Sequence, residues 1–275
     1  MAAVLAAAAL HATWNALVKA GGDGFAVLAL AIGLPALPIL ALLPFVPLPA
    51  AASWPYLVAS TLVHWVYFGC LLGAYRHGDL SQVYPIARGT APLLVALGAW
   101  ALAGEALGRL EAIGLVVLSA GILSLAWRRG PRPAGEARGM LLALATAATI
   151  AAYSLFDGLG VRRAGTVPGY ILWVFLMTGG PFLGFALWRR RHDWRVSVAP
   201  SLKAGLGGAA TSTLAYGIVI WAMSQGPMAH VIALRETSVV IAAGIGAWLL
   251  GEPFGRRRLL AAAVAAAGAA LLQLG

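Results

Sequence analysis

The chain consists of long apolar stretches that are separated by short polar breaks. Hydrophobic residues make up 61% of it and charged residues only 10%, far below the roughly 25% of charged residues in soluble domains. A helix needs about 20 apolar residues to cross the ~30 Å hydrocarbon core of a bilayer, and it satisfies its own backbone hydrogen bonds there. The sequence therefore predicts an all-α, multi-pass protein of the cell (inner or plasma) membrane with ten transmembrane helices, at residues 2–19, 24–46, 54–76, 80–103, 109–127, 139–161, 167–188, 203–224, 228–250 and 256–274.

The two halves of the chain repeat one pattern of charged residues. Each half has an arginine early in an apolar stretch and then a Gly-Glu-x-x-Gly-Arg turn, and equivalent residues stand at one constant separation: Arg88, Thr90, Glu105 and Arg109 match Arg235, Thr237, Glu252 and Arg256. This predicts two five-helix repeats, residues 1–130 and 139–275, joined by a loop at 131–138. Because five is an odd number of membrane crossings, the second repeat must be inverted relative to the first, and inverted repeats permit alternating access.

Basic residues lie in short clusters between the apolar stretches. The formal net charge is +10, but this distribution is typical of topology signals at membrane edges and not of a nucleic-acid-binding surface. Of the 17 arginines and lysines in the loops and at the span ends, 14 lie on one side of the membrane by the predicted span count, so the positive-inside rule places both termini outside. Cys70 is the only cysteine, which excludes an internal disulfide, and no metal-ligand spacing or cofactor motif is present.

Three features resemble one known family, the EamA-type permeases of the drug/metabolite transporter superfamily. They are the opening stretch with His11, Trp14, Asn15 and Lys19, the ten spans in two halves, and the turn that is used twice, at 104–109 and 251–256. The resemblance covers essentially the whole chain. It implies a secondary transporter, since many members export amino acids or other small metabolites, and it implies cytoplasmic termini, which conflicts with the charge count.

Arg88 and Arg235 lie inside apolar stretches, where an ionisable residue is costly and by default indicates function. One interpretation is substrate binding, in which a guanidinium group anchors a carboxylate or phosphate. The other is structural, in which each arginine holds a neighbouring helix through backbone carbonyls or Glu236. Inversion is expected to place the two arginines on opposite sides of the membrane midplane, one for each face of an alternating site. Pro85 and Pro92 are expected to break backbone hydrogen bonds in this stretch and to expose carbonyls beside Arg88.

Proton coupling has five candidate residues. Glu236 and Asp157 are the carboxylates placed inside apolar stretches, where such a group can carry a proton, and Glu236 is the preferred one. A fixed ion pair for Glu236 and an interfacial position for Asp157 are the alternatives. His11, His64 and His230 also lie in apolar stretches, where a histidine more often packs between helices than relays protons.

Aromatic and amide side chains in or near the middle of the spans complete the candidate substrate site. A tyrosine that faced lipid would leave its hydroxyl without a hydrogen bond, so several are expected to face the interior, where they either line a cavity or simply pack. The residues are Trp14, Asn15, Tyr67, Tyr84, Tyr153 and Tyr216.

Together these features favour a secondary active transporter, in particular an exporter, of a small carboxylate-bearing metabolite such as an amino acid, coupled to protons. The chain has no Gly-x-x-x-x-Gly-Lys-Ser/Thr motif, so ATP is not expected to drive it. Phosphorylated, phosphonate or cationic drug-like solutes are alternatives, although the first span lacks the acidic residue expected of a cation exporter. A membrane-embedded lipid-modifying enzyme would need a nucleophile–base pair or metal cluster, and neither is evident, so no catalysis is expected. The expected partners are the substrate and membrane lipid, without nucleic acid or cofactor, and the chain is expected to be a monomer or homodimer.

Overall fold

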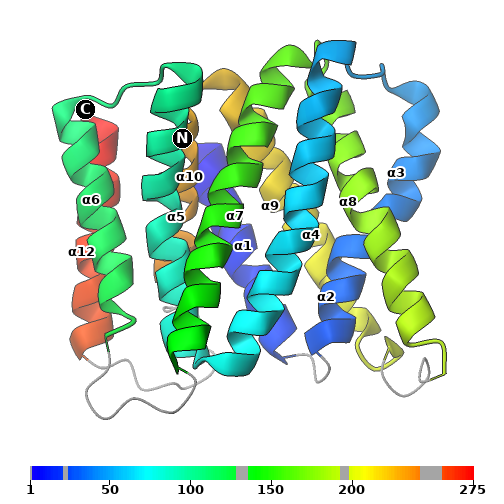
Figure 1. Ribbon diagram of the computed structural model, residues 1–275, viewed down its shortest axis with the longest axis horizontal. Coiled ribbons are helices and arrows are strands. Elements are labelled where there is room, and N and C mark those ends of the chain that lie inside the picture. The colour runs from blue at the N-terminus through cyan, green and yellow to red at the C-terminus, as the bar shows by residue number, and fades with distance from the viewer. Residues whose placement is uncertain (1, 21–23, 128–135, 193–197, 242–255) are drawn as a thin grey trace. The chain divides into compact units, whose positions relative to one another are not determined.

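The computed structural model describes residues 2–20, 24–127, 136–192, 198–241 and 256–275, and every regular element in these ranges is a helix (Figure 1). The α-helices are α1 (Ala2–Ala20), α2 (Gly24–Gly33), α3 (Ala36–Leu42), α4 (Trp54–His77), α5 (Leu80–Ala103), α6 (Arg109–Ser124), α7 (Glu136–Arg163), α8 (Val167–Arg189), α9 (Leu202–Gln225), α10 (Met228–Arg235) and α12 (Arg256–Leu274). Two short 3₁₀ helices, η1 (Leu43–Phe45) and η2 (Ala51–Ser53), precede α4.

Local capping signals set several of these boundaries. Helix α5 begins after Asp79, whose carboxylate accepts a hydrogen bond from the Ser81 N–H at 3.1 Å. It ends at Gly104, which has a φ of 67°, a left-handed conformation that glycine adopts without steric cost. The Thr166 side chain caps α8 by accepting a bond from the Gly169 N–H. The sequence therefore encodes these helix ends locally.

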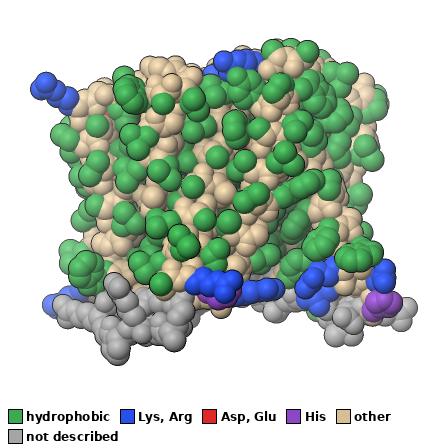
Figure 2. Space-filling view, in the orientation of Figure 1, with side chains coloured by type: hydrophobic (Ala, Val, Ile, Leu, Met, Phe, Trp, Pro, Cys, Tyr) green, Lys and Arg blue, Asp and Glu red, His purple; other side chains and the backbone are tan. Residues whose placement is uncertain are grey.

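Seven helical segments of the described chain are long and apolar enough to cross a membrane: Phe25–Phe45, Ala51–His77, Ser81–Ala103, Ala137–Arg163, Val167–Arg189, Leu202–Gln225 and Arg256–Leu274. They match seven of the ten predicted spans. Of the other three, 2–19 corresponds to α1, 109–127 to the shorter α6, and 228–250 begins with α10 and continues outside the described residues. On the face shown in Figure 2, hydrophobic side chains cover the helices, and lysines and arginines gather near helix ends, as expected of membrane helices.

The chain divides into two compact units, and each unit takes segments from both halves of the sequence. The first unit comprises residues 1–61 and 157–225, and the second comprises residues 62–156 and 226–275. The chain passes from one unit to the other within α4 and within α7. The predicted division into repeats at 1–130 and 139–275 rests on sequence similarity and stays a prediction, as do the inversion of the second repeat and the count of ten spans.

In the first unit, α1 and α2 pack against α9, and α2 and α3 pack against α8. Small residues allow this packing: a Cβ on Gly205 of α9 would lie 2.6 Å from a methyl carbon of Leu30. Ser212 of α9 donates a hydrogen bond to the Ala31 carbonyl of α2 at 3.3 Å. Close backbone approach and hydrogen bonds between helices are the usual means of association in membranes, where no hydrophobic effect drives helices together.

In the second unit, α6 packs along α12, and α5 contacts both α6 and α10. A Cβ on Gly268 of α12 would lie 2.6 Å from the Leu118 Cα, and a Cβ on Gly121 of α6 would lie 2.6 Å from the Ala265 nitrogen. Any side chain at these two glycines would therefore force the helix backbones apart. The two glycines fix how closely α6 and α12 approach.

Two of the predicted spans are interrupted. Residues 24–46 form α2, α3 and η1 in place of one helix, and the interruption lies at Pro35, which has no N–H to donate to the preceding turn. The second interruption follows α10: Glu236 and Thr237 form a turn, and residues 238–241 are helical again.

The two prolines inside α5 do not end the helix. Helix α5 continues from Leu80 to Ala103 through both Pro85 and Pro92. Prolines are tolerated in membrane helices because neighbouring helices and local adjustments satisfy the backbone groups that they free. The interrupted backbone lies beside Arg235 instead.

Candidate substrate site

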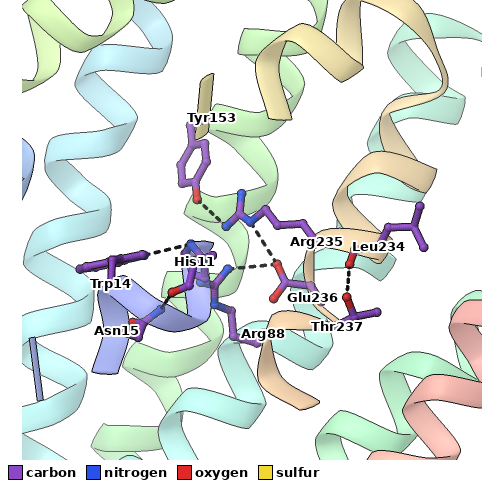
Figure 3. A network of polar contacts seen from close by, with 9 residues as sticks. All are labelled: His11, Trp14, Asn15, Arg88, Tyr153, Leu234, Arg235, Glu236 and Thr237. Carbon is purple, nitrogen blue, oxygen red and sulfur yellow. Dashed lines mark hydrogen bonds and ion pairs between the residues drawn. The ribbon is translucent and has the colours of Figure 1, made fainter. Parts of the chain in front are cut away.

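Two arginines of the second unit converge on one carboxylate (Figure 3). Nη1 of Arg88 on α5 donates to Oε1 of Glu236 at 3.0 Å, and Nε of Arg235 lies 3.6 Å from the same oxygen. Each arginine is 4% exposed and Glu236 is completely buried. Nη2 of Arg235 also donates to the hydroxyl of Tyr153 on α7 at 3.4 Å. Arg88, Arg235 and Glu236, here termed the charge cluster, together carry one more positive than negative charge when ionised.

Arg235 and Glu236 lie where α10 ends in a turn. The Thr237 N–H bonds to the Leu234 carbonyl at 3.1 Å. The Glu236 N–H is shared between the Ala233 carbonyl at 3.1 Å and the Ile232 carbonyl at 3.2 Å, so the three-residue bonds of a tighter turn begin here. Interrupted helices of this kind hold substrates and ions in membrane transporters.

The start of α10 is fixed by the first copy of the repeated turn. Glu105 accepts a hydrogen bond from the Met228 N–H, at the first residue of α10, at 2.7 Å. A carboxylate at a helix N-terminus satisfies a backbone donor and interacts favourably with the helix dipole. In the same turn, the Gly108 N–H donates to Glu111 at 2.6 Å. The turn thus joins α5 to α6 and also anchors the helix that carries Arg235; residues 251–255 of the second copy lie outside the described residues.

Aromatic side chains surround the charge cluster. The Tyr153 ring stacks on His64, with centroids 4.0 Å apart, and meets the Tyr67 ring edge-on at 5.6 Å. The Arg88 guanidinium lies over the Tyr84 ring, 5.5 Å from its centroid, an arrangement in which the ring face attracts the cation. The structure therefore brings Tyr67, Tyr84, Tyr153 and His64 together with both arginines, as a substrate site would require.

Two polar atoms at the interruption have no hydrogen-bond partner among the described residues. They are Oε2 of Glu236 and Oγ of Ser238, and both residues are completely buried. Buried polar atoms are nearly always hydrogen-bonded, and each exception calls for an explanation. Contact with a polar ligand would satisfy both atoms.

The first unit contains a second buried carboxylate, Asp157 on α7, which is completely buried. The hydroxyls of Tyr170 on α8 and Tyr216 on α9 donate to its two oxygens at 3.2 Å and 2.5 Å. Ser60 on α4 donates to it as well. Tyr216, expected at the substrate site, thus hydrogen-bonds to Asp157 in a different unit from the charge cluster.

The remaining predicted residues form local contacts. On α1, Nε1 of Trp14 donates to Nδ1 of His11 at 3.0 Å, and Nδ2 of Asn15 donates to the His11 carbonyl at 2.7 Å. In the second unit, Nε2 of His230 on α10 lies 3.1 Å from Oε1 of Glu111 on α6. His230 therefore links α10 to α6. Among the described residues, no group of three or more metal-ligating side chains occurs.

Sequence reasoning did not identify Ser60, Tyr170 or Ser238. Ser60 and Tyr170 lie far from Asp157 along the chain, and no sequence spacing relates the three residues. Ser238 is three residues after Arg235, one helical turn, and that spacing was a usable signal. The expectation that Arg88 and Arg235 act separately at opposite faces is also not what the geometry favours, because both approach one oxygen of Glu236.

The fold is that of a helical multi-pass membrane protein with a buried arginine–carboxylate cluster. The sequence model of the EamA-like transporter family matches residues 137–274, half of the chain. The chain belongs to this family, which is part of the drug/metabolite transporter superfamily, and the resemblance seen in its motifs is confirmed. No curated protein matches the chain significantly. A solved structure, described only as the crystal structure of a protein, has a TM-score of 0.74 at 18% identity and covers 99% of this chain and 94% of its own, which shows a shared fold.

Proposed function

We propose that the protein is a secondary active transporter that exports a small carboxylate-bearing metabolite, such as an amino acid, by alternating access driven by protons. The main support is the convergence of Arg88 and Arg235 on the carboxylate of Glu236 inside an apolar unit. Membership of a transporter family supports the class of function. The two inverted five-helix repeats predicted from the sequence, with a central cavity between them, would provide the alternating access.

The carboxylate of Glu236 indicates which kind of ligand the two arginines can bind. A substrate carboxylate has the same charge and the same two oxygens, so it can take the place of Glu236 in front of the guanidinium groups. Glu236 lies in a turn between helical segments, where a small backbone rotation moves its side chain without unfolding either segment. Exchanging one carboxylate for another keeps the two buried guanidinium groups paired with an anion, and leaving such a group without a partner costs about 3–5 kcal/mol.

The aromatic neighbours suit the rest of such a substrate. Tyr153 and His64 are 4% and 8% exposed, and their stacked rings offer an apolar wall beside the arginines. Substrate sites combine apolar walls with a few placed polar groups that fix orientation. An amino acid with an apolar side chain matches both features.

A phosphate or phosphonate substrate is the second candidate, because guanidinium groups bind phosphate oxygens in the same bidentate manner. The excess positive charge of the cluster disfavours a cationic drug-like substrate. Uptake assays with the full chain in proteoliposomes separate these classes, using labelled amino acids, organic acids, a phosphonate and a quaternary ammonium ion. We expect saturable transport of one or more carboxylates; transport of the ammonium ion alone would refute the proposal.

Arginine substitutions test the site directly. Arg88→Ala and Arg235→Ala should each abolish carboxylate transport in folded protein, because the lost 3–5 kcal/mol corresponds to a loss of affinity of about hundreds-fold or more. Arg109→Ala is the matched control, since Arg109 is an exposed arginine of the same unit, and it should transport normally. Wild-type transport by both cluster variants would rule out an anchoring role.

A double variant separates binding from a purely structural ion pair. Arg88→Met with Glu236→Gln removes both charges of the Arg88–Glu236 pair, a replacement that proteins often tolerate, and Arg235 keeps its hydrogen bond to Tyr153. If the pair only holds α5 to α10, this variant should fold and transport. We expect it to fold and to remain inactive.

A further inference from the structure

The carboxylate of Asp157 in the first unit is not used by the substrate site. Four helices supply its hydrogen-bonded set: Asp157 comes from α7, Ser60 from α4, Tyr170 from α8 and Tyr216 from α9. All four residues belong to the same compact unit. A fully buried carboxylate in a helix that is long and apolar enough to cross a membrane requires a functional or structural explanation.

The shape of α7 is adapted to this arrangement. Gly160 lies one turn after Asp157, and a Cβ at Gly160 would approach ring carbons of Tyr170 to 2.7 Å. Because glycine has no side chain at this position, the Tyr170 ring can pack against the backbone of α7. Tyr170 itself is completely buried. The chain provides space for this hydroxyl to reach the carboxylate.

Every hydrogen-bond donor to Asp157 is a neutral hydroxyl. A hydroxyl both donates and accepts, so the same set can bond the ionised carboxylate and the neutral acid. On protonation, the new O–H of Asp157 can donate to one of the hydroxyl oxygens, while the other hydroxyls still donate to the carboxyl group. Asp157 can thus keep hydrogen-bond partners in both protonation states.

Charged groups on the surrounding helices bind elsewhere. On α7, Nε of Arg162 donates to the Met223 carbonyl at 2.9 Å, and Nη1 of Arg163 donates to the Leu159 carbonyl at 3.0 Å. The guanidinium of Arg163 also lies over the Tyr56 ring near the start of α4.

The other basic residues of the packed helices lie at helix ends. Arg189 is in the last turn of α8 and Lys203 is in the first turn of α9. The titratable groups that face Asp157 are the hydroxyls of Tyr170 and Tyr216.

Glu236 has the opposite environment. Its carboxylate is in contact with two guanidinium groups, whereas the partners of Asp157 among the described residues are hydroxyls. A change of charge at Asp157 therefore breaks no ion pair of the described residues.

We infer that Asp157 is the proton carrier of the transport cycle, taking up a proton from one side and releasing it to the other. This inference rests on the proposed transport function and assigns its coupling step to a residue outside the charge cluster.

The first test needs no substrate. Infrared difference spectra of the purified full chain, recorded between about pH 5 and pH 8, should contain the carbonyl band of a protonated carboxyl group. The band should vanish in Asp157→Asn and persist in Asp79→Asn, a matched change at the exposed cap of α5. Tyr216→Phe should shift its frequency, because the carboxyl group loses one hydrogen-bond partner. Absence of the band from the wild type, its persistence in Asp157→Asn, or an unshifted band in Tyr216→Phe would overturn the inference.

The second test uses transport. Proteoliposomes with the full chain and a labelled amino acid mixture report exchange between equal pools and uptake driven by a pH step. Asp157→Asn should retain exchange and lose pH-driven uptake at least tenfold, while Asp79→Asn retains both. pH-driven uptake that survives in Asp157→Asn would refute the carrier role alone. If the wild type exchanges nothing while its infrared band depends on Asp157, the proposed substrate class fails and the protonation of Asp157 is supported.

Discussion

Replacing Glu236 with glutamine removes the negative charge of the charge cluster and nearly preserves the shape of the side chain. Oε1 lies 3.0 Å from Nη1 of Arg88 and 3.6 Å from Nε of Arg235. At an effective dielectric constant of about 20, such contacts are worth about 5.5 and about 4.6 kcal/mol before the cost of desolvation. Desolvation offsets much of this, and breaking one buried pair costs about 3–5 kcal/mol.

The variant should therefore be markedly less stable than the wild type. At roughly 2–4 °C for each kcal/mol in a large domain, its apparent Tm should fall by about 6–20 °C. A small carboxylate anion such as acetate should restore part of the loss, because it can pair with the two guanidinium groups when the glutamine side chain turns aside, as proposed for the substrate. Saturating binding at 100 times Kd contributes about 2.7 kcal/mol.

Thermal unfolding in detergent, with acetate compared against chloride at equal ionic strength, measures both effects. Asp157→Asn is the matched control, because it also removes a completely buried carboxylate but one whose donors are neutral hydroxyls. Acetate should stabilise Glu236→Gln and leave Asp157→Asn unchanged. Equal stabilisation of both variants, or no loss of stability in Glu236→Gln, would refute the reasoning from the two arginines.

Two further predictions concern packing and topology. Gly268→Ala should lower the apparent Tm, since overpacking costs about 1–3 kcal/mol. The control Gly69→Ala, with no atom within 4 Å of its Cβ, should be neutral or stabilising. Equal Tm values for the two variants would contradict the close approach of α6 and α12. Fusions of alkaline phosphatase and green fluorescent protein at Gly275 should show an external C-terminus. The reason is that 14 of the 17 basic residues in the loops and at the span ends lie on the opposite side by the predicted span count. Cytoplasmic fluorescence without phosphatase activity would contradict that orientation.

The helix positions were predictable because the bilayer constrains them strongly. The predicted span 80–103 coincides with α5, and the spans 54–76 and 203–224 differ from α4 and α9 by one or two residues. A membrane helix must be long enough to cross the hydrocarbon core and must satisfy its own backbone, so hydropathy alone sets its ends closely. The interruption after Arg235 was not predictable in this way, because Glu236 and Thr237 are neither glycine nor proline and Glu236 pairs with a residue 148 positions earlier.

The same limit applies to the choice between the two buried carboxylates. In the sequence, each has arginine nearby: Glu236 follows Arg235 directly, and Asp157 precedes Arg162 by five residues. Only tertiary packing separates them, because Arg162 donates to the Met223 carbonyl, while Arg88 reaches across from α5 to Glu236. One carboxylate is thereby held between cations, and the other lies among hydroxyls. If the first position binds the substrate anion and the second carries the proton, as proposed, single substitutions at the two positions should affect different steps of transport.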